Sequence, residues 1–124
     1  MVGITGLYSY DDTRRMATAE WYIFKPYRKK GYAKEAITAL AAHAFAGKLF
    51  EMRETAWRNQ FRRHYVKIDL IRADIREKNI PSQKTADSCG FVYQHTDHRH
   101  FVIEGEGFED ARIYELTPET LIML

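Results

Sequence analysis

Two neighbouring segments at the start of the chain, residues 2–12 and 16–25, are rich in apolar residues and are separated by a short polar stretch. The first segment, VGITGLYSYDD, ends in two acidic residues that indicate a turn. The second, MATAEWYIFK, is rich in aromatic and branched side chains. Such segments form strands, and the short polar connection between them favours an antiparallel hairpin. The pattern therefore predicts that the fold begins with two paired strands.

Helical periodicity follows in residues 33–46, where apolar residues recur three and four positions apart and the next residue is a glycine, a common C-terminal cap. Residues 48–64 also predict an amphipathic helix, because Phe50, Trp57 and Phe61 would lie on one side of it. The two segments together predict consecutive helices after the first hairpin.

The second half of the chain returns to strand patterns around one further helix. Residues 65–75 alternate as a strand, with a change of parity that predicts a bulge or splay near Leu70. Residues 80–90 predict a short helix, with proline in the first turn and glycine at the end. Strands are then expected from Phe91 to a polar turn and, after the loop EGEGFED, across residues 111–116.

Length and composition favour one domain. The 124 residues are 45% hydrophobic, enough for a single core, so residues 1–124 are expected to form one α/β or α+β unit. The net charge of +2 does not by itself indicate a nucleic-acid partner. Cys89 is the only cysteine, which excludes an intrachain disulfide, and no apolar run reaches the ~20 residues of a membrane span. We therefore expect a cytoplasmic protein that does not contact a membrane.

A basic turn, FKPYRKKGYA (residues 24–33), lies between the second predicted strand and the first predicted helix. The N–H groups of a first helical turn lack intrahelical partners, and a glycine lets an anion approach the backbone closely. Arg28, Lys29 and Lys30 add positive charge beside Gly31, so the segment suits a phosphate group. The same residues also suit an ordinary turn with a solvated surface, because the segment lacks the full pattern of a nucleotide-binding loop.

Three segments carry a combination of motifs: RKKGYA (28–33), NIPSQKTADSCGF (79–91) and EDARIYEL (109–116). Together they resemble the GNAT superfamily of acyl-CoA N-acyltransferases. The first resembles its R/Q-x-x-G-x-G/A signature and the second its N-x-x-S…G-F segment. The third resembles the D-x-x-x-Y-x-L closing strand of the ribosomal-protein alanine N-acetyltransferase branch. The resemblance implies a mixed, mostly antiparallel sheet flanked by helices, with acetyl-CoA (coenzyme A) as cosubstrate.

The resemblance also implies a binding site for coenzyme A. In the family, the R-x-x-G-x-A turn binds the pyrophosphate, which assigns that role here to Arg28, Lys29, Lys30, Gly31, Tyr32 and Ala33. The preceding strand bonds the pantetheine arm through its backbone, which implies Ile23 and Phe24 for that contact. Asn79 matches an asparagine beside the pantetheine and Ser82 its partner at the helix start, although simple helix capping explains Ser82 at least as well.

Acetylation of an amine needs a base that removes a proton from the ammonium before the nitrogen attacks the thioester. Many family members carry a glutamate on the strand before the turn, which implies Glu20 as this catalytic base. The alternative is a solvated strand carboxylate, because the spacing from Glu20 to Arg28 is shorter than the family usually shows. The position of the family's tyrosine acid is occupied here by Ala86.

Two departures from the family affect the expected assembly. The family's first strand, two helices and second strand have no counterpart before Val2, so the resemblance covers the C-terminal, coenzyme A-binding part of an N-terminally truncated fold. The first predicted strand would then have an unpaired edge that is prone to pairing with another chain, and a homodimer is expected. Residues 48–64 are longer than the usual connection and are the alternative cover for part of the core.

Three other features have simpler explanations than a functional site. HTDHRH (95–100) gathers histidines, but a strand would not bring a third ligand to them, so no metal site is expected. Cys89 suits a small buried side chain. Trp57 and Phe61 are interleaved with arginines, as in nucleic-acid stacking platforms. Aromatics packed on the core beside solvated arginines explain this pattern more simply, so a nucleic-acid partner is not expected.

The sequence thus predicts an acetyl-CoA-dependent N-acetyltransferase that acts on a primary amine, either a protein N-terminus or a small amine. The alternative is a non-catalytic module that keeps a partial acetyltransferase fold for coenzyme A binding or protein interaction. The two functions differ in whether a base and a complete acceptor pocket exist.

Overall fold

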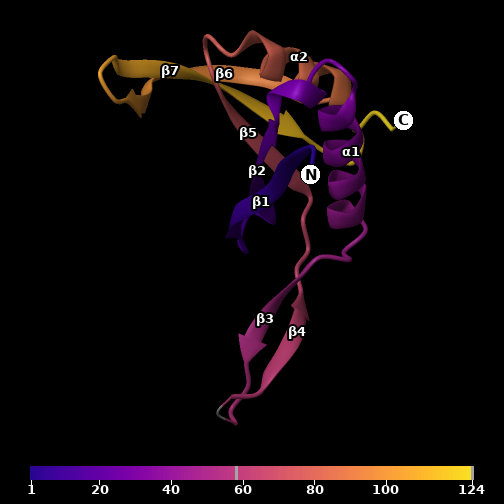
Figure 1. Cartoon of the computed structure of the whole chain (residues 1–124). Helices are drawn as coiled ribbons and strands as arrows, with labels where there is room; N and C mark the ends of the chain where they lie inside the picture. Colours follow the sequence, from indigo (N-terminus) through magenta and orange to yellow (C-terminus); the bar gives the residue numbers. More distant parts are fainter. Residues whose placement is uncertain (58, 124) are drawn as a thin grey trace.

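The computed structural model describes residues 1–57 and 59–123, which form a five-stranded sheet, two α-helices and a separate two-stranded ribbon (Figure 1). The sheet has the strand order β1-β2-β5-β7-β6, and every pairing in it is antiparallel except β2 with β5. The expected mixed, mostly antiparallel sheet flanked by helices is confirmed. The elements are β1 (Gly3–Asp11), β2 (Met16–Ile23), a 3-10 turn (Lys25–Tyr27), α1 (Tyr32–Phe45), β3 (Phe50–Glu54), β4 (Phe61–Tyr65), β5 (Leu70–Arg76), α2 (Ile80–Cys89), β6 (Val92–Ile103) and β7 (Gly107–Leu116).

The first hairpin forms where the two apolar segments predict it. β1 and β2 pair along most of their length. The turn between them is closed by Asp11, whose Oδ1 accepts hydrogen bonds from the backbone N–H groups of Thr13 (3.0 Å) and Arg14 (3.1 Å). β1 lies at the edge of the sheet, and no strand in the described part of the chain pairs with its outer side. The exposed edge expected from the sequence is therefore present.

Both helices pack on one face of the sheet, and the small side chains of that face let them approach closely. α1 buries Ile37, Ala41 and Ala44 in the same core as Ala17 and Ala19 of β2. The exposed positions of α1 are Tyr32, Glu35, Ala39 and His43, a mixture of polar, aromatic and small side chains. Among the described residues, neither helix has the length and apolar character that a membrane crossing requires.

β2 and β5 are neighbours, but they separate after a short parallel stretch. They pair only across residues 16–18 and 70–72. Further along, β2 continues to pair with β1, and β5 continues to pair with β7. The sheet therefore opens between β2 and β5 toward the C-terminal ends of these two strands.

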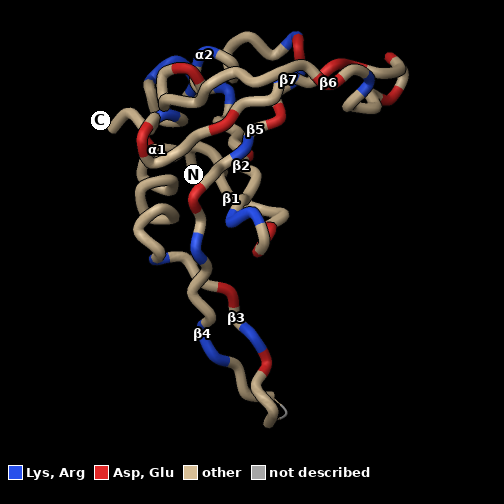
Figure 2. Tube along the Cα trace, turned by 180° about the vertical axis from the view of Figure 1, so that it is seen from behind, with Lys and Arg blue, Asp and Glu red and all other residues tan. Residues whose placement is uncertain are grey.

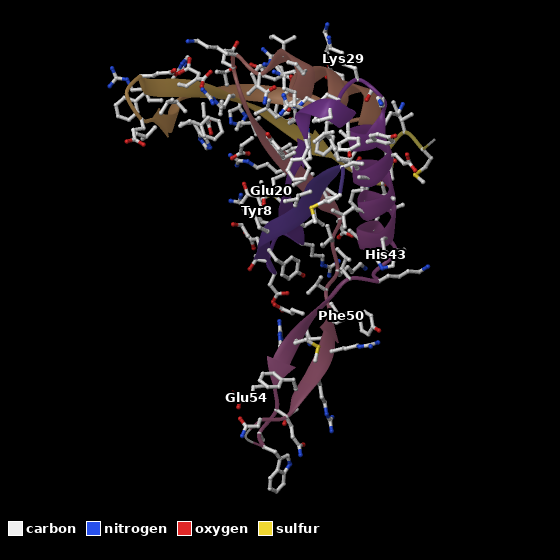
Figure 3. All side chains as sticks on the ribbon, in the orientation of Figure 1. Tyr8, Glu20, Lys29, His43, Phe50 and Glu54 are labelled. Carbon is white, nitrogen blue, oxygen red and sulfur yellow. The ribbon has the colours of Figure 1, made fainter. Side chains whose placement is uncertain are left out.

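The prediction of a helix across residues 48–64 is wrong. This segment forms β3, β4 and the turn between them, which we call the arm, and it projects away from the sheet (Figure 3). The turn contains Asn59 in a left-handed conformation with φ 66°. The aromatic side chains are exposed rather than packed on the core, with exposed fractions of 44% for Phe50, 74% for Trp57 and 56% for Phe61. The arm therefore does not cover the core as the sequence suggested.

The strand boundaries on either side of α2 also differ from the prediction. The strand expected across residues 65–75 is two elements, because β4 ends at Tyr65 and β5 begins at Leu70. β6 continues through the segment HTDHRH, so no polar turn exists there, and β7 begins within the segment expected as a loop. Two irregularities in the β6–β7 register absorb the extra residues of β6, as β-bulges do.

The end of α2 is joined to the C-terminal segment through Gly90. The helix predicted across residues 80–90 is confirmed, and Gly90 caps it with φ 101°. The N–H of Ile122 donates a hydrogen bond of 2.9 Å to the carbonyl of Cys89, and a Cβ on Gly90 would collide with the carbonyl oxygen of Thr120. Cys89 is buried, as expected, and burial raises the pKa of its thiol.

The contact at Gly90 predicts a difference between two glycine substitutions. Gly90 and Gly47 both have positive φ, 101° and 72°, so alanine at either position carries a backbone strain of roughly 1–2 kcal/mol. Only at residue 90 does the added Cβ also meet backbone atoms. We expect Gly90→Ala to lower the free energy of unfolding by about 2 kcal/mol more than Gly47→Ala, measured by urea denaturation. Equal losses of unfolding free energy in the two variants would show that the C-terminal segment moves away from the added Cβ without destabilising the fold.

Candidate functional site

A cavity of about 840 Å³ opens where β2 ends, next to the start of α1 and along α2. Most of the residues predicted to bind coenzyme A line it: Ile23, Arg28, Lys29, Gly31, Tyr32, Ala33, Asn79 and Ser82. Phe24, Lys30 and Glu20 are not among the lining residues. The structure thus brings the basic turn and the start of α2, which are far apart in the sequence, to the same cavity.

The basic turn ends at Gly31, which caps α1 in a left-handed conformation with φ 79°. Glycine adopts this conformation without a steric penalty. The following N–H groups, those of Tyr32, Ala33 and Lys34, begin the helix and lack intrahelical acceptors. A Cβ on Gly31 would meet no protein atom within 4 Å, so open space lies beside the backbone at this point. The start of α1 is therefore suited to an anion.

Arg28 is directed back toward β2. Its Nε donates a hydrogen bond of 2.8 Å to the carbonyl of Ile23, and its guanidinium carbon lies 5.3 Å from the centre of the Tyr22 ring. These contacts fix the guanidinium group at the end of the strand. Positive charge in the cavity is supplied in addition by three lysines among its lining residues: Lys29, Lys34 and Lys84.

The backbone of Phe24 is already hydrogen-bonded within the protein. Its N–H donates to the carbonyl of Val2 (2.8 Å), and its carbonyl accepts from the N–H of Tyr27 (2.9 Å). A pantetheine hydrogen bond to Phe24 would replace or share one of these bonds. Ile23 lines the cavity and is the better placed of the two residues predicted for this contact.

Asn79 is the N-cap of α2. Its Oδ1 accepts a hydrogen bond of 3.2 Å from the N–H of Ser82. The capping role that the sequence allowed for Ser82 therefore belongs to the side chain of Asn79. Both residues line the cavity, so capping holds Asn79 in position without removing it from the site.

The sequence analysis missed the wall that α2 contributes to the cavity. Pro81, Lys84, Thr85 and Ser88 line it. Their spacing of i, i+3, i+4 and i+7 places them on one face of the helix. The helical spacing of these residues can be read in the sequence. Apolar periodicity does not reveal it, because this face of α2 is mostly polar.

Two carboxylates flank the gap between β2 and β5 on the sheet face that is turned away from the helices. Thr18 and Arg72 form the last parallel pair, and Glu20 and Asp74 each follow two residues later on their strands. Residues two apart on a strand share a face, so both carboxylates lie on the face that carries Thr18 and Arg72. Tyr8 of β1 lies near Glu20 (Figure 3).

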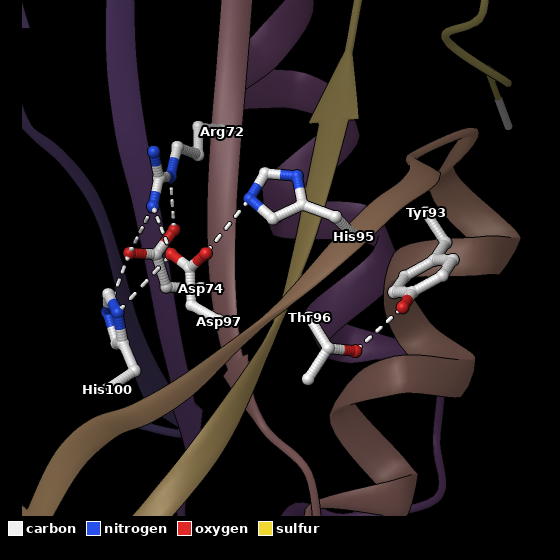
Figure 4. Close-up of polar contacts among 7 residues, drawn as sticks. All are labelled: Arg72, Asp74, Tyr93, His95, Thr96, Asp97 and His100. Carbon is white, nitrogen blue, oxygen red and sulfur yellow. Dashed lines mark hydrogen bonds and ion pairs between the residues drawn. The ribbon is translucent and has the colours of Figure 1, made fainter.

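Asp74 is part of a network of charged side chains from β5 and β6 (Figure 4). Its Oδ1 accepts a hydrogen bond of 2.6 Å from Arg72 Nε, and its Oδ2 lies 3.1 Å from His100 Nε2. Asp97 Oδ2 lies 3.6 Å from Arg72 Nη2 and from His100 Nδ1, and Asp97 Oδ1 lies 3.0 Å from His95 Nε2. The hydrogen bond to Asp74 is the main cause of a raised Arg72 pKa. Across the described residues, no three acidic, histidine or cysteine side chains are arranged to hold a metal ion.

Glu20 differs from Asp74 in its surroundings. It is exposed, and its carboxylate forms no ion pair with any described residue. The nearby Tyr8 has a pKa raised above its ordinary value, first by burial and then by the negative charges of Asp74 and Glu20. The Tyr8 hydroxyl is therefore protonated at neutral pH and can donate a hydrogen bond. Sequence analysis missed Asp74 and Tyr8 because only the strand order brings them beside Glu20.

Residues 1–92 match the model of the acetyltransferase (GNAT) domain, and no curated protein sequence matches the chain. Similar solved structures include Mycobacterium smegmatis RimJ in complex with CoA-disulfide, with 20% identity and a TM-score of 0.76, covering 98% of this chain and 50% of that chain. The ribosomal-protein-S5-alanine acetyltransferase of Vibrio fischeri has 15% identity and a TM-score of 0.75, covering 98% and 57%. A chimera of spermidine N-acetyltransferase SpeG from Vibrio cholerae and hSSAT has 17% identity and a TM-score of 0.74, covering 96% and 62%.

The chain thus spans between 50% and 62% of the length of these three structures. At such identities, the structural matches establish the fold, and the family itself is established by the domain match over residues 1–92. The first two motifs form the glycine-capped start of α1 and the Asn79-capped α2, and the third lies in β7. The chain belongs to the GNAT acetyltransferase family.

Proposed function

We propose that this chain binds acetyl-CoA and transfers the acetyl group to a primary amine, either a protein N-terminus or a small amine. The observation that supports this most is the position of the gap between β2 and β5. The cavity at the end of β2 lies on the helix side of the sheet, and Glu20 and Asp74 lie on the other side of the gap. A thioester that reaches the gap from the cavity would meet an acceptor beside these carboxylates.

Coenzyme A suits the cavity in both size and charge. Its volume of about 840 Å³ lies within the usual range of about 300–1,000 Å³ for ligand pockets. The pyrophosphate would bind at the start of α1, where free N–H groups and lysines favour an anion, and the pantetheine would extend along the end of β2. The CoA-disulfide complex of RimJ, a protein of the same fold, supports this assignment.

Glu20 is the proposed base. It accepts a proton from the acceptor ammonium, and the amine nitrogen attacks the thioester carbonyl carbon. The carbon–sulfur bond then breaks, and the second proton lost by the nitrogen passes to the leaving thiolate, which gives the amide and the coenzyme A thiol. Asp74 is held in place by Arg72 and His100, and we propose that it orients the cationic acceptor. Tyr8 supplies a protonated hydroxyl beside both carboxylates.

The charge on the acceptor side favours cationic amines. Proteins of the same fold named for spermidine and for the ribosomal protein S5 alanine support an amine acceptor, small or terminal. We also propose that the protein is cytoplasmic, since Cys89 is a free thiol. We further propose that it forms a homodimer. The second candidate function is a non-catalytic coenzyme A-binding module, which is supported by the exposure of Glu20 to solvent.

Substitution of Gly31 tests the coenzyme A site. A Cβ on Gly31 meets no protein atom, so the protein itself tolerates alanine there except for the strain of a positive φ. We expect Gly31→Ala to weaken coenzyme A binding at least tenfold, about 1.4 kcal/mol, because the Cβ occupies the space of the pyrophosphate. The measurement is isothermal titration calorimetry with coenzyme A.

Gly47→Ala is the matched control for this experiment, because Gly47 has a similar φ of 72° and follows the other end of the same helix, also with open space around it. It should leave the affinity for coenzyme A unchanged. If the two variants bind coenzyme A equally well, the pyrophosphate does not lie at the start of α1.

Substitution of the two carboxylates tests the catalytic assignment. We expect Glu20→Gln to lower kcat about 100-fold while the affinity for coenzyme A is retained, because only the proton acceptor is removed. Asp74→Asn should mainly raise the KM for the amine. Thiol release from acetyl-CoA, with spermidine and a peptide with a free N-terminus as acceptors, measures both effects.

Glu104→Gln, in the distant turn between β6 and β7, is the control. Loss of kcat in Asp74→Asn together with full activity in Glu20→Gln would assign the base to Asp74. If wild-type protein binds coenzyme A but acetylates neither acceptor nor any of a panel of other primary amines, the non-catalytic function is favoured.

A further inference from the structure

The arm is the part of the molecule that the proposed chemistry does not use. β3 and β4 pair with each other over all five residues of each strand, and they form a sheet separate from the other strands. In Figure 1 the arm extends away from the body beyond the end of α1 that is opposite the coenzyme A cavity. A two-stranded ribbon is marginally stable in water unless something packs against it.

One face of the arm is apolar. Residues directly opposite each other in the ribbon share a face, which places Phe50 with Tyr65, Met52 with Arg63, and Glu54 with Phe61 on the same side. The four apolar side chains of this face have exposed fractions of 44% (Phe50) and 56% (Met52, Phe61 and Tyr65). Glu54 and Arg63 complete this face of the ribbon, and we call all six residues the apolar face. Nothing in the described part of the chain covers it.

The other face of the arm is polar. It consists of Glu51 opposite His64 and Arg53 opposite Arg62. Figure 2 shows Lys and Arg along β4, and both signs of charge along β3. The arm is therefore amphipathic, like a strand pair at the surface of a folded domain, although it has no domain beneath it.

A hollow of about 310 Å³ lies at the base of the arm, and we call it the root cavity. Its lining is mostly apolar, with Leu7, Leu40, Leu49 and Val66 among its walls. Phe50 belongs both to this lining and to the apolar face, so the two surfaces are continuous. The hollow has about ten times the ~30 Å³ volume of a water molecule, enough for one large side chain.

A large side chain of this kind lies at the other end of the arm. Trp57, in the turn between β3 and β4, is 74% exposed. Such exposure of a tryptophan is typical of residues that anchor protein interfaces. The arm thus carries a bulky apolar group at its tip and an apolar hollow at its base.

We propose that the arms of two copies of this chain pack against each other through their apolar faces, antiparallel, with Trp57 of each copy in the root cavity of the other. Two-fold symmetry then uses the tip and the base of both arms at once. This interface uses the arm and the root cavity, whose lining includes Leu7, Tyr8 and Tyr10 of β1. It is inferred from these surfaces and does not depend on the proposed acetyltransferase activity.

The charges of the apolar face favour this antiparallel arrangement. The guanidinium carbon of Arg63 lies 4.9 Å from the centre of the Phe50 ring, so its charge is near the base of the arm. Glu54 is at the end of β3 nearest the tip. In the antiparallel pair, the tip of one arm meets the base of the other, which brings Glu54 of each copy toward Arg63 of its partner. A parallel pair would bring like ends together and lose this match.

The area available is sufficient for a stable contact. An aromatic or Met side chain that is half exposed offers about 100 Å², so the four apolar side chains contribute about 800 Å² from two copies. Trp57, Arg63 and Glu54 add enough to exceed the roughly 1,000 Å² expected of a specific interface. The outer edge of β1 is a second surface on which two copies could meet, through its unpaired backbone groups.

Sedimentation equilibrium tests the proposal on the full chain. Wild-type protein should be a dimer, and Trp57→Ser or Phe61→Ser should weaken dimerisation at least tenfold, because each removes an anchor from the apolar face. Both side chains are exposed in the monomer, so the fold should survive, which circular dichroism checks. The control is Arg62→Ser, on the polar face of the same strand, which should remain as dimeric as wild type.

A charge exchange tests the antiparallel register. Glu54→Arg and Arg63→Glu should each weaken the dimer, and the double variant should restore it, because the opposite charges then meet again with the signs reversed. In a Trp21→Phe background, the emission of Trp57 should shift to shorter wavelength as the protein concentration rises and the indole leaves water.

Three results would overturn the proposal. One is a wild-type chain that remains monomeric at every concentration tested. Another is a dimer that is unaffected by Trp57→Ser and Phe61→Ser but is lost in Ile4→Lys, which would place the interface at the edge of β1. The third is a dimer in which the double charge variant is no stronger than the single variants, which would exclude the antiparallel pairing.

Discussion

The short parallel contact between β2 and β5 is the constraint on which the rest of the site depends. Three residue pairs join the two strands, and each strand then follows its antiparallel neighbour, β1 for β2 and β7 for β5. Because both outer ladders are long, the gap cannot close without breaking hydrogen bonds elsewhere in the sheet. The opening is therefore part of the sheet itself rather than a property of mobile loops. A site built on strands is held more rigidly than one built on loops.

The elements that the sequence predicts correctly are those with strong local signals. The Asp11 turn, the helical period of α1 and the proline and glycine at the ends of α2 each act within a few residues. The arm was predicted as a helix because Phe50, Trp57 and Phe61 would lie on one side of an amphipathic helix. Its strand period becomes clear only when the segment is divided at the turn. Without a core beneath it, the arm also lacks the strong contrast between buried and exposed positions that usually identifies a strand.

In the candidate site, too, the contacts between residues close in sequence could be predicted, whereas those between distant segments could not. The residues of the basic turn line one cavity because strand, turn and helix are contiguous in the chain. The pairing of His100 with Asp74 could not be predicted from the sequence, because it requires the registers of β5 with β7 and of β6 with β7. The sequence also could not show that the backbone of Phe24 is engaged by Val2, a contact between segments that only the hairpin brings together.

The difference between the two carboxylates follows from what each one contacts. Only 15% of the Asp74 side chain is exposed, so its charge is stable only because Arg72 and His100 satisfy its oxygens. A carboxylate held in this way is fixed in position, since turning it toward another group would leave Arg72 without its partner. Glu20 lies at the same distance beyond the last parallel pair and forms no such contacts with the described residues, so its protonation breaks no ion pair. The same gap in the sheet thus carries one carboxylate fixed by Arg72 and His100 and one that is exposed and forms no ion pair with the described residues, and this difference in contacts supports the assignment of the base to Glu20.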